Sequence, residues 1–234
     1  MTRTALITGA SRGIGFETVK MLAEDGAGFD QIVMVARDTP RFHEAVAEMQ
    51  ASGTKTQIIG IAADLSDPDV VDRIYEELDQ KSVRLTTIIN NAGFTKPASI
   101  NETDMDDFER TMRTNLYSPF RIIQIALRKN HPLAQIVNIA STAGMNGRAG
   151  WLTYSASKSA MINMSEVLRS ELAPYGIDVI CLSPGRCATD LRKTLAPDED
   201  PSTIMQPEQV AEIVKLMISD TGALLHSQNL VVRT

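Results

Sequence analysis

Short apolar runs alternate with stretches of helical periodicity along the chain. The runs predict strands at residues 5–7, 32–35, 58–62, 85–89, 136–139, 178–182 and 230–232, the last at an edge. Between them, apolar residues at helical spacing predict helices from Phe16 to near Gly26 or Gly28, over 40–51, 67–78, 103–129 and 154–173, and from Gln206 onward. Continuously apolar strands are typical of a sheet covered on both faces. We therefore expect an α/β fold with a doubly wound parallel sheet of about seven strands, as a single domain over residues 1–234.

The first apolar run ends in a glycine-rich turn, Thr8-Gly9-Ala10-Ser11-Arg12-Gly13-Ile14-Gly15. A strand, a glycine-rich turn and a helix together can bind a phosphate, because glycines allow close backbone approach and the helix start supplies N–H groups. The spacing is G-x-x-x-G-x-G and not G-x-G-x-x-G. An ordinary turn is the alternative, but the position after the first strand favours a phosphate site.

The second run ends at Ala36-Arg37-Asp38, where dinucleotide folds place the residue that reads the ribose 2′ position. Ala36 supplies no carboxylate, and Arg37 and Arg12 are suited to a 2′-phosphate. NADP is therefore favoured over NAD. Asp38 could still bond a ribose diol, although Asp38 or Thr39 also suits the N-cap of the next helix.

Polar residues follow the third and fourth runs. Asp64-Leu65 either accepts from an adenine amino group or closes the turn before a helix. Asn90-Asn91-Ala92-Gly93 ends the fourth run at the carboxyl edge of the sheet, where ligands bind in open α/β folds.

The stretch 103–129 contains Asn115, a poor residue for a helix interior, and Pro119. It predicts either a local kink near the active site or an exposed asparagine. The fifth run leads to Ser141, and the sixth leads to Pro184-Gly185 with Thr189 beyond.

Tyr154 and Lys158 lie four residues apart, on one face of a predicted helix. A lysine charge beside a phenol favours the phenolate and lowers the tyrosine pKa from its ordinary value of about 10. Such a tyrosine can exchange a proton with a substrate oxygen. A chance pair on a solvated helix is the alternative when these two residues are taken alone.

Composition narrows the function further. The chain has 234 residues, a net charge of −6 and 5% aromatic residues, which argues against nucleic acid. No apolar run approaches the roughly 20 residues of a membrane span, and the N-terminus has no signal-peptide pattern, so we expect a cytoplasmic protein. The two cysteines and three histidines show no disulfide framework or metal spacing. Cys181 is expected to be buried and the histidines to lie at the surface.

Five motifs in register resemble the short-chain dehydrogenase/reductase family. They are the glycine turn from Thr8 to Gly15, Asn90-Asn91-Ala92-Gly93, Ser141, Tyr154-Ser155-Ala156-Ser157-Lys158, and Pro184-Gly185 with Thr189. The resemblance spans nearly the whole chain. It implies a Rossmann fold whose N-terminal part binds the cofactor and whose C-terminal part carries catalysis and substrate binding.

The resemblance also implies roles for individual residues. Tyr154 would exchange the proton, Ser141 would bond the substrate oxygen, Lys158 would hold the nicotinamide ribose and bias Tyr154, and Asn115 would hold a water through its carbonyl. Besides Tyr154 and Lys158, the implied cofactor contacts are Gly9, Ser11, Arg12, Gly13, Ile14, Gly15, Arg37, Asp64, Leu65, Asn91, Ala92, Gly93, Pro184, Gly185 and Thr189. No metal is implied.

Two departures from the family pattern concern the substrate side. Only seventeen residues separate Thr189 from Pro207, so the lid is short and we expect an open or partly disordered site. The chain ends without the aspartate and paired glycines common in the family. This puts a C-terminal contribution to the pocket or to a tetramer interface in doubt.

The leading interpretation is an NADP-dependent reductase of a carbonyl, most similar to 3-oxoacyl-acyl-carrier-protein reductases. A sugar, a polyol or another small polar carbonyl is the alternative substrate, and a non-catalytic NADP-binding sensor or scaffold is the alternative class. A basic surface for an acidic carrier is available at Arg110, Arg113, Arg121, Arg128 and Lys129, unless these form a solvated, salt-bridged face.

The resemblance further implies a homodimer or homotetramer. Ala160, Met161, Met164 and Leu168 suit either a partner helix or the chain's own sheet.

Overall fold

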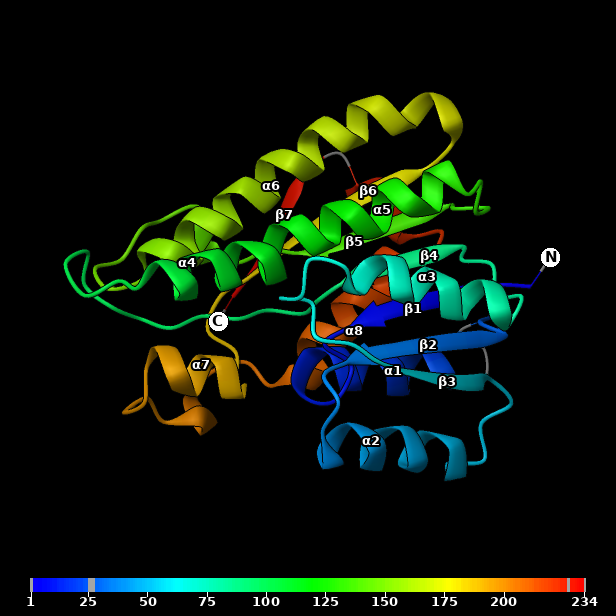
Figure 1. The fold of residues 1–234 in the computed structure, drawn as a ribbon, viewed down its shortest axis with the longest axis horizontal. Helices are drawn as coiled ribbons and strands as arrows, with labels where there is room; N and C mark the ends of the chain where they lie inside the picture. Colours follow the sequence, from blue (N-terminus) through cyan, green and yellow to red (C-terminus); the bar gives the residue numbers. More distant parts are fainter. Residues whose placement is uncertain (1, 25–27, 227, 234) are drawn as a thin grey trace.

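A single parallel sheet runs through the centre of the computed structural model, which describes residues 2–24, 28–226 and 228–233 (Figure 1). The described strands are β1 (Thr4–Thr8), β2 (Gln31–Ala36), β3 (Gln57–Ala62), β4 (Thr87–Asn90), β5 (Gln135–Ile139), β6 (Asp178–Pro184) and β7 (Asn229–Val232). Their order across the sheet is β3-β2-β1-β4-β5-β6-β7, with every neighbouring pair parallel. The predicted doubly wound sheet is confirmed, with β7 at one edge.

Helices cover both faces of the sheet (Figure 1). On one face, α1 (Gly13–Ala23), α2 (Pro40–Ala51) and α8 (Pro207–Met217) contribute to the same apolar core. On the other, α3 (Val70–Gln80), α5 (Ser118–Arg128) and α6 (Leu152–Leu172) pack against the sheet. The first helix ends at Ala23, before the expected end; Gly26, one of the two expected ends, lies outside the described residues.

The long helix expected over 103–129 is divided into two. It begins as α4 (Met105–Met112), passes through a π-helical turn at Arg113–Tyr117 and continues as α5. Asn115, in this turn, is fully buried, so the interpretation as an exposed asparagine is wrong. Single π-helical turns occur frequently at functional sites.

The direction of the strand order reverses at the centre of the sheet. β1 lies between β2 and β4, so connections leave its carboxyl end and that of β4 toward opposite faces. In open α/β sheets the crevice at this reversal is where ligands bind. The glycine turn after β1 and the Asn90–Gly93 stretch after β4 therefore lie side by side.

The expectation of surface histidines is wrong for two of the three. His131 is buried, where its Nδ1 accepts the Leu85 N–H at 2.8 Å and its ring packs edge-on against Tyr75. His226 is also buried, with Nε2 2.6 Å from the Met217 carbonyl. Each of these two histidine rings forms a hydrogen bond with a backbone group near the end of an element. The spacing of histidines in the sequence does not predict such contacts. Cys181 is buried, as expected.

Most of the cations expected to form a carrier-binding surface are paired instead. Arg121 lies 2.9 Å from Asp72, Lys129 lies 2.6 Å from Asp79, and Arg110 and Arg113 each have a carboxylate at 3.9 Å. This arrangement favours the salt-bridged interpretation of this surface.

Among the described residues, no helix combines the length and apolarity needed to cross a membrane. The same part of the chain holds no cluster of three or more His, Cys, Asp or Glu side chains suited to a metal ion.

Candidate active site

A cavity of about 740 Å³ opens at the carboxyl ends of the strands. Its wall runs from Arg37, after β2, past the glycine turn to Tyr154 on α6. All of the predicted catalytic and cofactor residues line this cavity except Asn115 and Gly15. The structure thus gathers residues from across the sequence around one space, of a size usual for ligand sites.

The glycine turn is shaped by close backbone approach. A Cβ at Gly9 would lie 2.8 Å from the Cα of Ala92, and a Cβ at Gly15 would lie 2.4 Å from the Gly9 carbonyl oxygen. Gly9 and Gly13 have φ values of +67° and +56°, which other residues rarely adopt. Gly15 therefore serves packing, while Gly13 and Ile14 bring the N-terminus of α1 to the cavity wall.

Hydrogen bonds between Asn91 and Thr8 join the turn after β1 to the stretch after β4. Asn91 Nδ2 donates to the Thr8 carbonyl at 2.9 Å, and the hydroxyl of Thr8 accepts the N–H groups of Asn91 and Ala92, each at 3.0 Å. The side-chain amide of Asn91 therefore fixes the glycine turn. Ala92 and Gly93 line the cavity beside it.

Arginines gather at the end of the cavity beside β2. Arg37 and Arg12 both line it, together with Arg41 on the first turn of α2, which the sequence analysis does not single out. Arg12 forms an ion pair with Asp190, and Arg41 lies 3.5 Å from the same carboxylate.

Asp38 and Thr39 take local roles at the start of α2. Asp38 lies 2.7 Å from His43 Nε2, and the hydroxyl of Thr39 caps α2 by accepting the Phe42 N–H at 3.3 Å. These contacts favour Thr39 as the cap, and they give Asp38 a partner other than a ribose diol.

Asp64 closes the turn before α3, which is one of the two alternatives considered for it. Its Oδ1 accepts from the N–H and the hydroxyl of Ser66, at 3.0 and 2.8 Å, and so closes the turn. The residue also lines the cavity beside Leu65 and faces Arg110 at 3.9 Å through Oδ2.

The catalytic candidates come from β5 and α6. Ser141 follows β5 and caps a short 3-10 turn, Thr142–Gly144. A Cβ at Gly144 would lie 2.6 Å from the backbone carbon of Lys158, so the absence of a side chain there lets this turn pack directly on α6. Ser141 is thereby held against the turn of α6 that carries Tyr154 and Lys158.

Lys158 is a buried cation whose described hydrogen bond is to a backbone carbonyl. Its side chain is 3% exposed, and Nζ donates to the Ile139 carbonyl at 2.7 Å. Burial lowers the pKa of Lys158 to about 8.

The predicted lowering of the Tyr154 pKa by Lys158 needs correction. Burial raises the pKa of Tyr154 above its ordinary value, and the opposing influences are a hydrogen bond with Ser141 and the charge of Arg192. Lys158 Nζ lies 5.9 Å from the centre of the tyrosine ring and is directed to a carbonyl instead.

Asn115 lies behind the cavity and not on its wall. Its Oδ1 accepts the Phe94 N–H at 2.8 Å, while Nδ2 donates to the Phe94 carbonyl at 3.0 Å and to the Ser157 hydroxyl at 2.9 Å. Asn115 thus ties the stretch after β4 to α6, one residue before Lys158.

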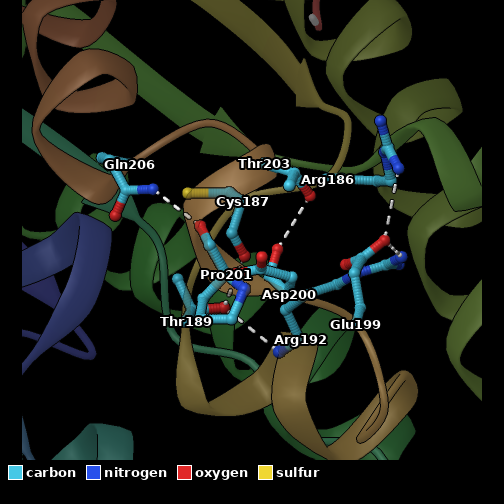
Figure 2. Close-up of polar contacts among 9 residues, drawn as sticks. All are labelled: Arg186, Cys187, Thr189, Arg192, Glu199, Asp200, Pro201, Thr203 and Gln206. Atoms are coloured by element: carbon cyan, nitrogen blue, oxygen red, sulfur yellow. Dashed lines mark hydrogen bonds and ion pairs between the residues drawn. The ribbon is translucent and has the colours of Figure 1, made fainter.

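The segment between Pro184 and Pro207 is ordered, contrary to the expected partial disorder (Figure 2). It forms α7 (Asp190–Leu195), which Thr189 caps by accepting the Arg192 N–H at 3.2 Å, and a 3-10 turn at Pro201–Thr203. Arg192 and Glu199 join its two ends through hydrogen bonds of 2.5 and 2.6 Å. Near the C-terminus, Arg233 also lines the cavity.

Sequence reasoning missed the polar groups on the substrate side. Arg148, Trp151, Arg186 and Arg192 all line the cavity near Tyr154. The signal that points to Trp151 is its position three residues before Tyr154. Arg148 and Arg186 belong to irregular segments and Arg192 to a separate short helix, so spacing predicts no common face for them.

Several known proteins are similar to this chain in sequence and in structure. The chain is 31% identical over 228 residues to a 3-oxoacyl-[acyl-carrier-protein] reductase of Synechocystis, with 94% of this chain and 91% of the relative covered. It is similar to the crystal structure of a blue fluorescent protein from a metagenomic library in complex with NADPH (TM-score 0.85, 30% identity, 98% and 96% covered).

A third similarity is to a putative NAD(P)-dependent gluconate 5-dehydrogenase from Beutenbergia cavernae with bound NADP (TM-score 0.86, 26% identity, 98% and 94% covered). The sequence model of the short chain dehydrogenase family matches residues 3–200. The chain belongs to the short chain dehydrogenase family of oxidoreductases.

Proposed function

We propose that the protein uses NADP(H) to interconvert a ketone and a secondary alcohol, with Tyr154 as the general acid in reduction and the general base in oxidation. One observation carries the proposal: a single cavity joins the glycine turn at the start of α1 to a buried tyrosine that hydrogen-bonds a serine. A dinucleotide bound along this wall, with its adenosine half near Arg37, would place its nicotinamide ring beside Tyr154.

The residues of the cavity fit NADP(H). Side chains are absent where the glycine turn folds against Ala92, and the N-terminus of α1 faces the same space, as a pyrophosphate requires. Arg37 and Arg12 would hold the 2′-phosphate. The remaining contacts would be Asp64 and Leu65 at the adenine, Asn91 at its ribose, and Pro184, Gly185 and Thr189 at the nicotinamide.

NADPH, when bound, supplies the hydride. Tyr154 would give its proton to the ketone oxygen, and the hydroxyl of Ser141 would hold that oxygen and stabilise its developing charge. Lys158, with a pKa of about 8, is suited to return a proton to Tyr154 near neutral pH and to bind the nicotinamide ribose. The carbonyl of Asn115 would hold a water that connects Lys158 to solvent.

The first candidate substrate is a 3-oxoacyl thioester, on the strength of the named Synechocystis relative. The pairing of Arg121 and Lys129 with carboxylates weakens the support for an acidic carrier as the partner. A sugar, a polyol or another small polar carbonyl is the second candidate. The arginines near Tyr154 and the gluconate dehydrogenase neighbour favour it.

Replacement of Tyr154 tests the proposal. NADPH oxidation is measured against acetoacetyl thioesters, diketones, keto sugars and cyclic ketones. We expect turnover with at least one class, and a fall of about 10²- to 10⁴-fold in Tyr154→Phe. Tyr175→Phe, which changes a tyrosine that is 77% exposed, should retain activity. NADPH binding without turnover on any ketone would favour the sensor or scaffold interpretation.

The cofactor preference has its own test. Arg37→Ala should weaken NADPH binding about tenfold to a hundredfold and leave NADH binding unchanged, because only NADPH carries the 2′-phosphate. Fluorescence titration of both cofactors measures this. Equal loss for both would contradict the assignment of Arg37.

Assembly into a homodimer or homotetramer is also part of the proposal. Met161 packs against Ala140 and Cys181 of its own chain, so it does not favour a partner helix. Tyr117, Phe120 and Val167 remain 46–48% exposed and supply an apolar surface instead. Light scattering of the purified protein measures the assembly state.

A further inference from the structure

The cavity is cationic although the chain is acidic. The described residues that line it include nine cationic side chains and four carboxylates, in a chain whose net charge is −6. The arginines beside β2 are accounted for by the proposed cofactor. Those near Tyr154 are not.

Three arginines surround the substrate end. The guanidinium groups of Arg148 and Arg192 lie 5.0 and 5.5 Å from the centre of the Trp151 ring, at the start of the helix that carries Tyr154. Arg192 is close enough to Tyr154 for its charge to lower the pKa of that phenol. The cluster therefore lies beside the reacting position.

A single carboxylate compensates these three cations. Both carboxylate oxygens of Glu199 accept hydrogen bonds from Arg192, at 2.5 and 2.6 Å. Arg186 lies 3.4 Å from one of the same oxygens (Figure 2). No carboxylate among the described residues lies within ion-pair distance of Arg148. The cluster thus holds a surplus of positive charge on the wall of the cavity, and because Arg148 and Arg186 are exposed there, an anionic ligand can reach both.

The ligand chemistry follows from the group that the cluster already accepts. Arg192 binds a carboxylate through two parallel hydrogen bonds, the geometry for which a guanidinium is suited. Arg148 and Arg186 have side chains of the same chemistry with capacity left for a second carboxylate. The Trp151 ring provides an apolar surface for the carbon chain between that carboxylate and the ketone.

We propose that the substrate carries a carboxylate of its own, which Arg148 and Arg186 bind while Tyr154 acts on a ketone a few carbons away. This rests on the proposed function and narrows it to oxo acids and the corresponding hydroxy acids. Arg192 is a positioning residue, because its pairing with Glu199 holds α7 and the cluster in place. A neutral thioester of an oxo acid would lack the group that these arginines bind.

Paired substrates test the inference. NADPH oxidation is measured with acetoacetate and levulinate, each against its neutral methyl ester. We expect kcat/KM for each acid to exceed that of its ester by about tenfold to a hundredfold. Arg148→Met and Arg186→Met should each reduce this acid-over-ester preference by about tenfold. Arg128→Met, which removes an exposed arginine distant from the cavity wall, should preserve it.

Binding without turnover gives an independent measurement. Calorimetry with the NADP⁺-loaded enzyme should detect butanoate but not butanamide, and Arg148→Met should abolish the difference. Equal kcat/KM for acid and ester, or binding of inorganic phosphate but not butanoate, would overturn the inference while the proposed function stands. If the wild-type enzyme turned over none of the ketones, the proposed function would be wrong. The calorimetric comparison of butanoate with butanamide would still show whether the arginines bind a carboxylate.

Discussion

Two walls of the same cavity are built in opposite ways. The catalytic wall, residues 139–158, holds Ser141, Tyr154 and Lys158, and its buried cation, Lys158, has a backbone carbonyl for a partner. The ion-paired wall, residues 185–206, is held by its own side chains, chiefly Arg192 and Glu199. The catalytic wall keeps Lys158 without a counter-charge, whereas the ion-paired wall joins Arg192 to both oxygens of Glu199.

This difference indicates that the two walls have different roles, one in chemistry and the other in adjusting to a ligand. A buried, uncompensated lysine costs folding free energy, and such costs are typical of groups kept for chemistry. A segment held by ion pairs at the edge of a cavity stabilises the fold little, but it can rearrange around a ligand. Mutations should therefore affect rate on the catalytic wall and local order on the ion-paired wall.

The largest effect is expected from Ser141→Ala on the catalytic wall. Loss of the proposed hydrogen bond to the substrate oxygen should lower kcat by about 10²- to 10³-fold. The same hydroxyl lowers the pKa of Tyr154, so the variant should raise that pKa. Reduction needs protonated Tyr154 and falls as pH rises through its pKa. The alkaline limb of the kcat profile should therefore move to higher pH.

Ser159→Ala is the matched control, because it removes an exposed hydroxyl from the same helix. It should leave the rate and the profile unchanged. An alkaline limb that stays in place in Ser141→Ala would contradict the contact between Ser141 and Tyr154.

A second prediction concerns stability on the catalytic wall. Lys158→Met should raise the free energy of unfolding at pH 7 by about 2 kcal/mol while abolishing turnover, because it removes a buried charge of lowered pKa. The folded pKa of about 8 lies below the ordinary value of 10.5. The unfolded chain therefore binds the proton more tightly, and the penalty in the wild type is full below pH 8 and disappears as pH rises toward 10.5.

Urea unfolding at pH 7 and pH 10 measures this difference. The gap between Lys158→Met and the wild type should narrow at pH 10. Lys215→Met, which changes a half-exposed lysine paired with Glu24, should show neither effect. A Lys158→Met protein less stable than the wild type at pH 7 would show that the bond to Ile139 outweighs the burial of the charge.

The two walls also differ in how far sequence predicts them. The catalytic wall follows from periodicity, because an apolar run places β5 within the sheet, helical periodicity predicts α6, and the four-residue spacing puts Tyr154 and Lys158 on one face of that helix. What spacing does not give is the environment of the lysine. Its burial and its bond to Ile139 depend on how α6 packs on β5, a contact between distant segments.

The ion-paired wall has no such periodicity. Arg192 and Glu199 lie seven residues apart across a helix end and a loop, so no regular element predicts their contact. The expectation of an open or partly disordered site rests on the shortness of this segment, which is also rich in Pro, Asp and Glu. That composition disfavours an apolar core, but it leaves charged side chains that can pair with a neighbouring arginine.

The smallest effect on global stability is expected from Glu199→Gln, which isolates the ion-paired wall. Both Arg192 and Arg186 lose their carboxylate, and the side chains of Arg192 and Glu199 are only 13% and 16% exposed, so the free energy of unfolding should fall by about 1 kcal/mol, with glutamine keeping the shape and one acceptor oxygen. Hydrogen exchange of the backbone amides in residues 188–205 should nevertheless accelerate about tenfold, because these residues open locally. Asp198→Asn removes the same charge from an exposed neighbour and should leave exchange unchanged. If Glu199→Gln lowered global stability as much as Lys158→Met raises it, the two walls would not differ in the way their contacts indicate, and Glu199 would belong to the folding core rather than to an adjustable binding surface.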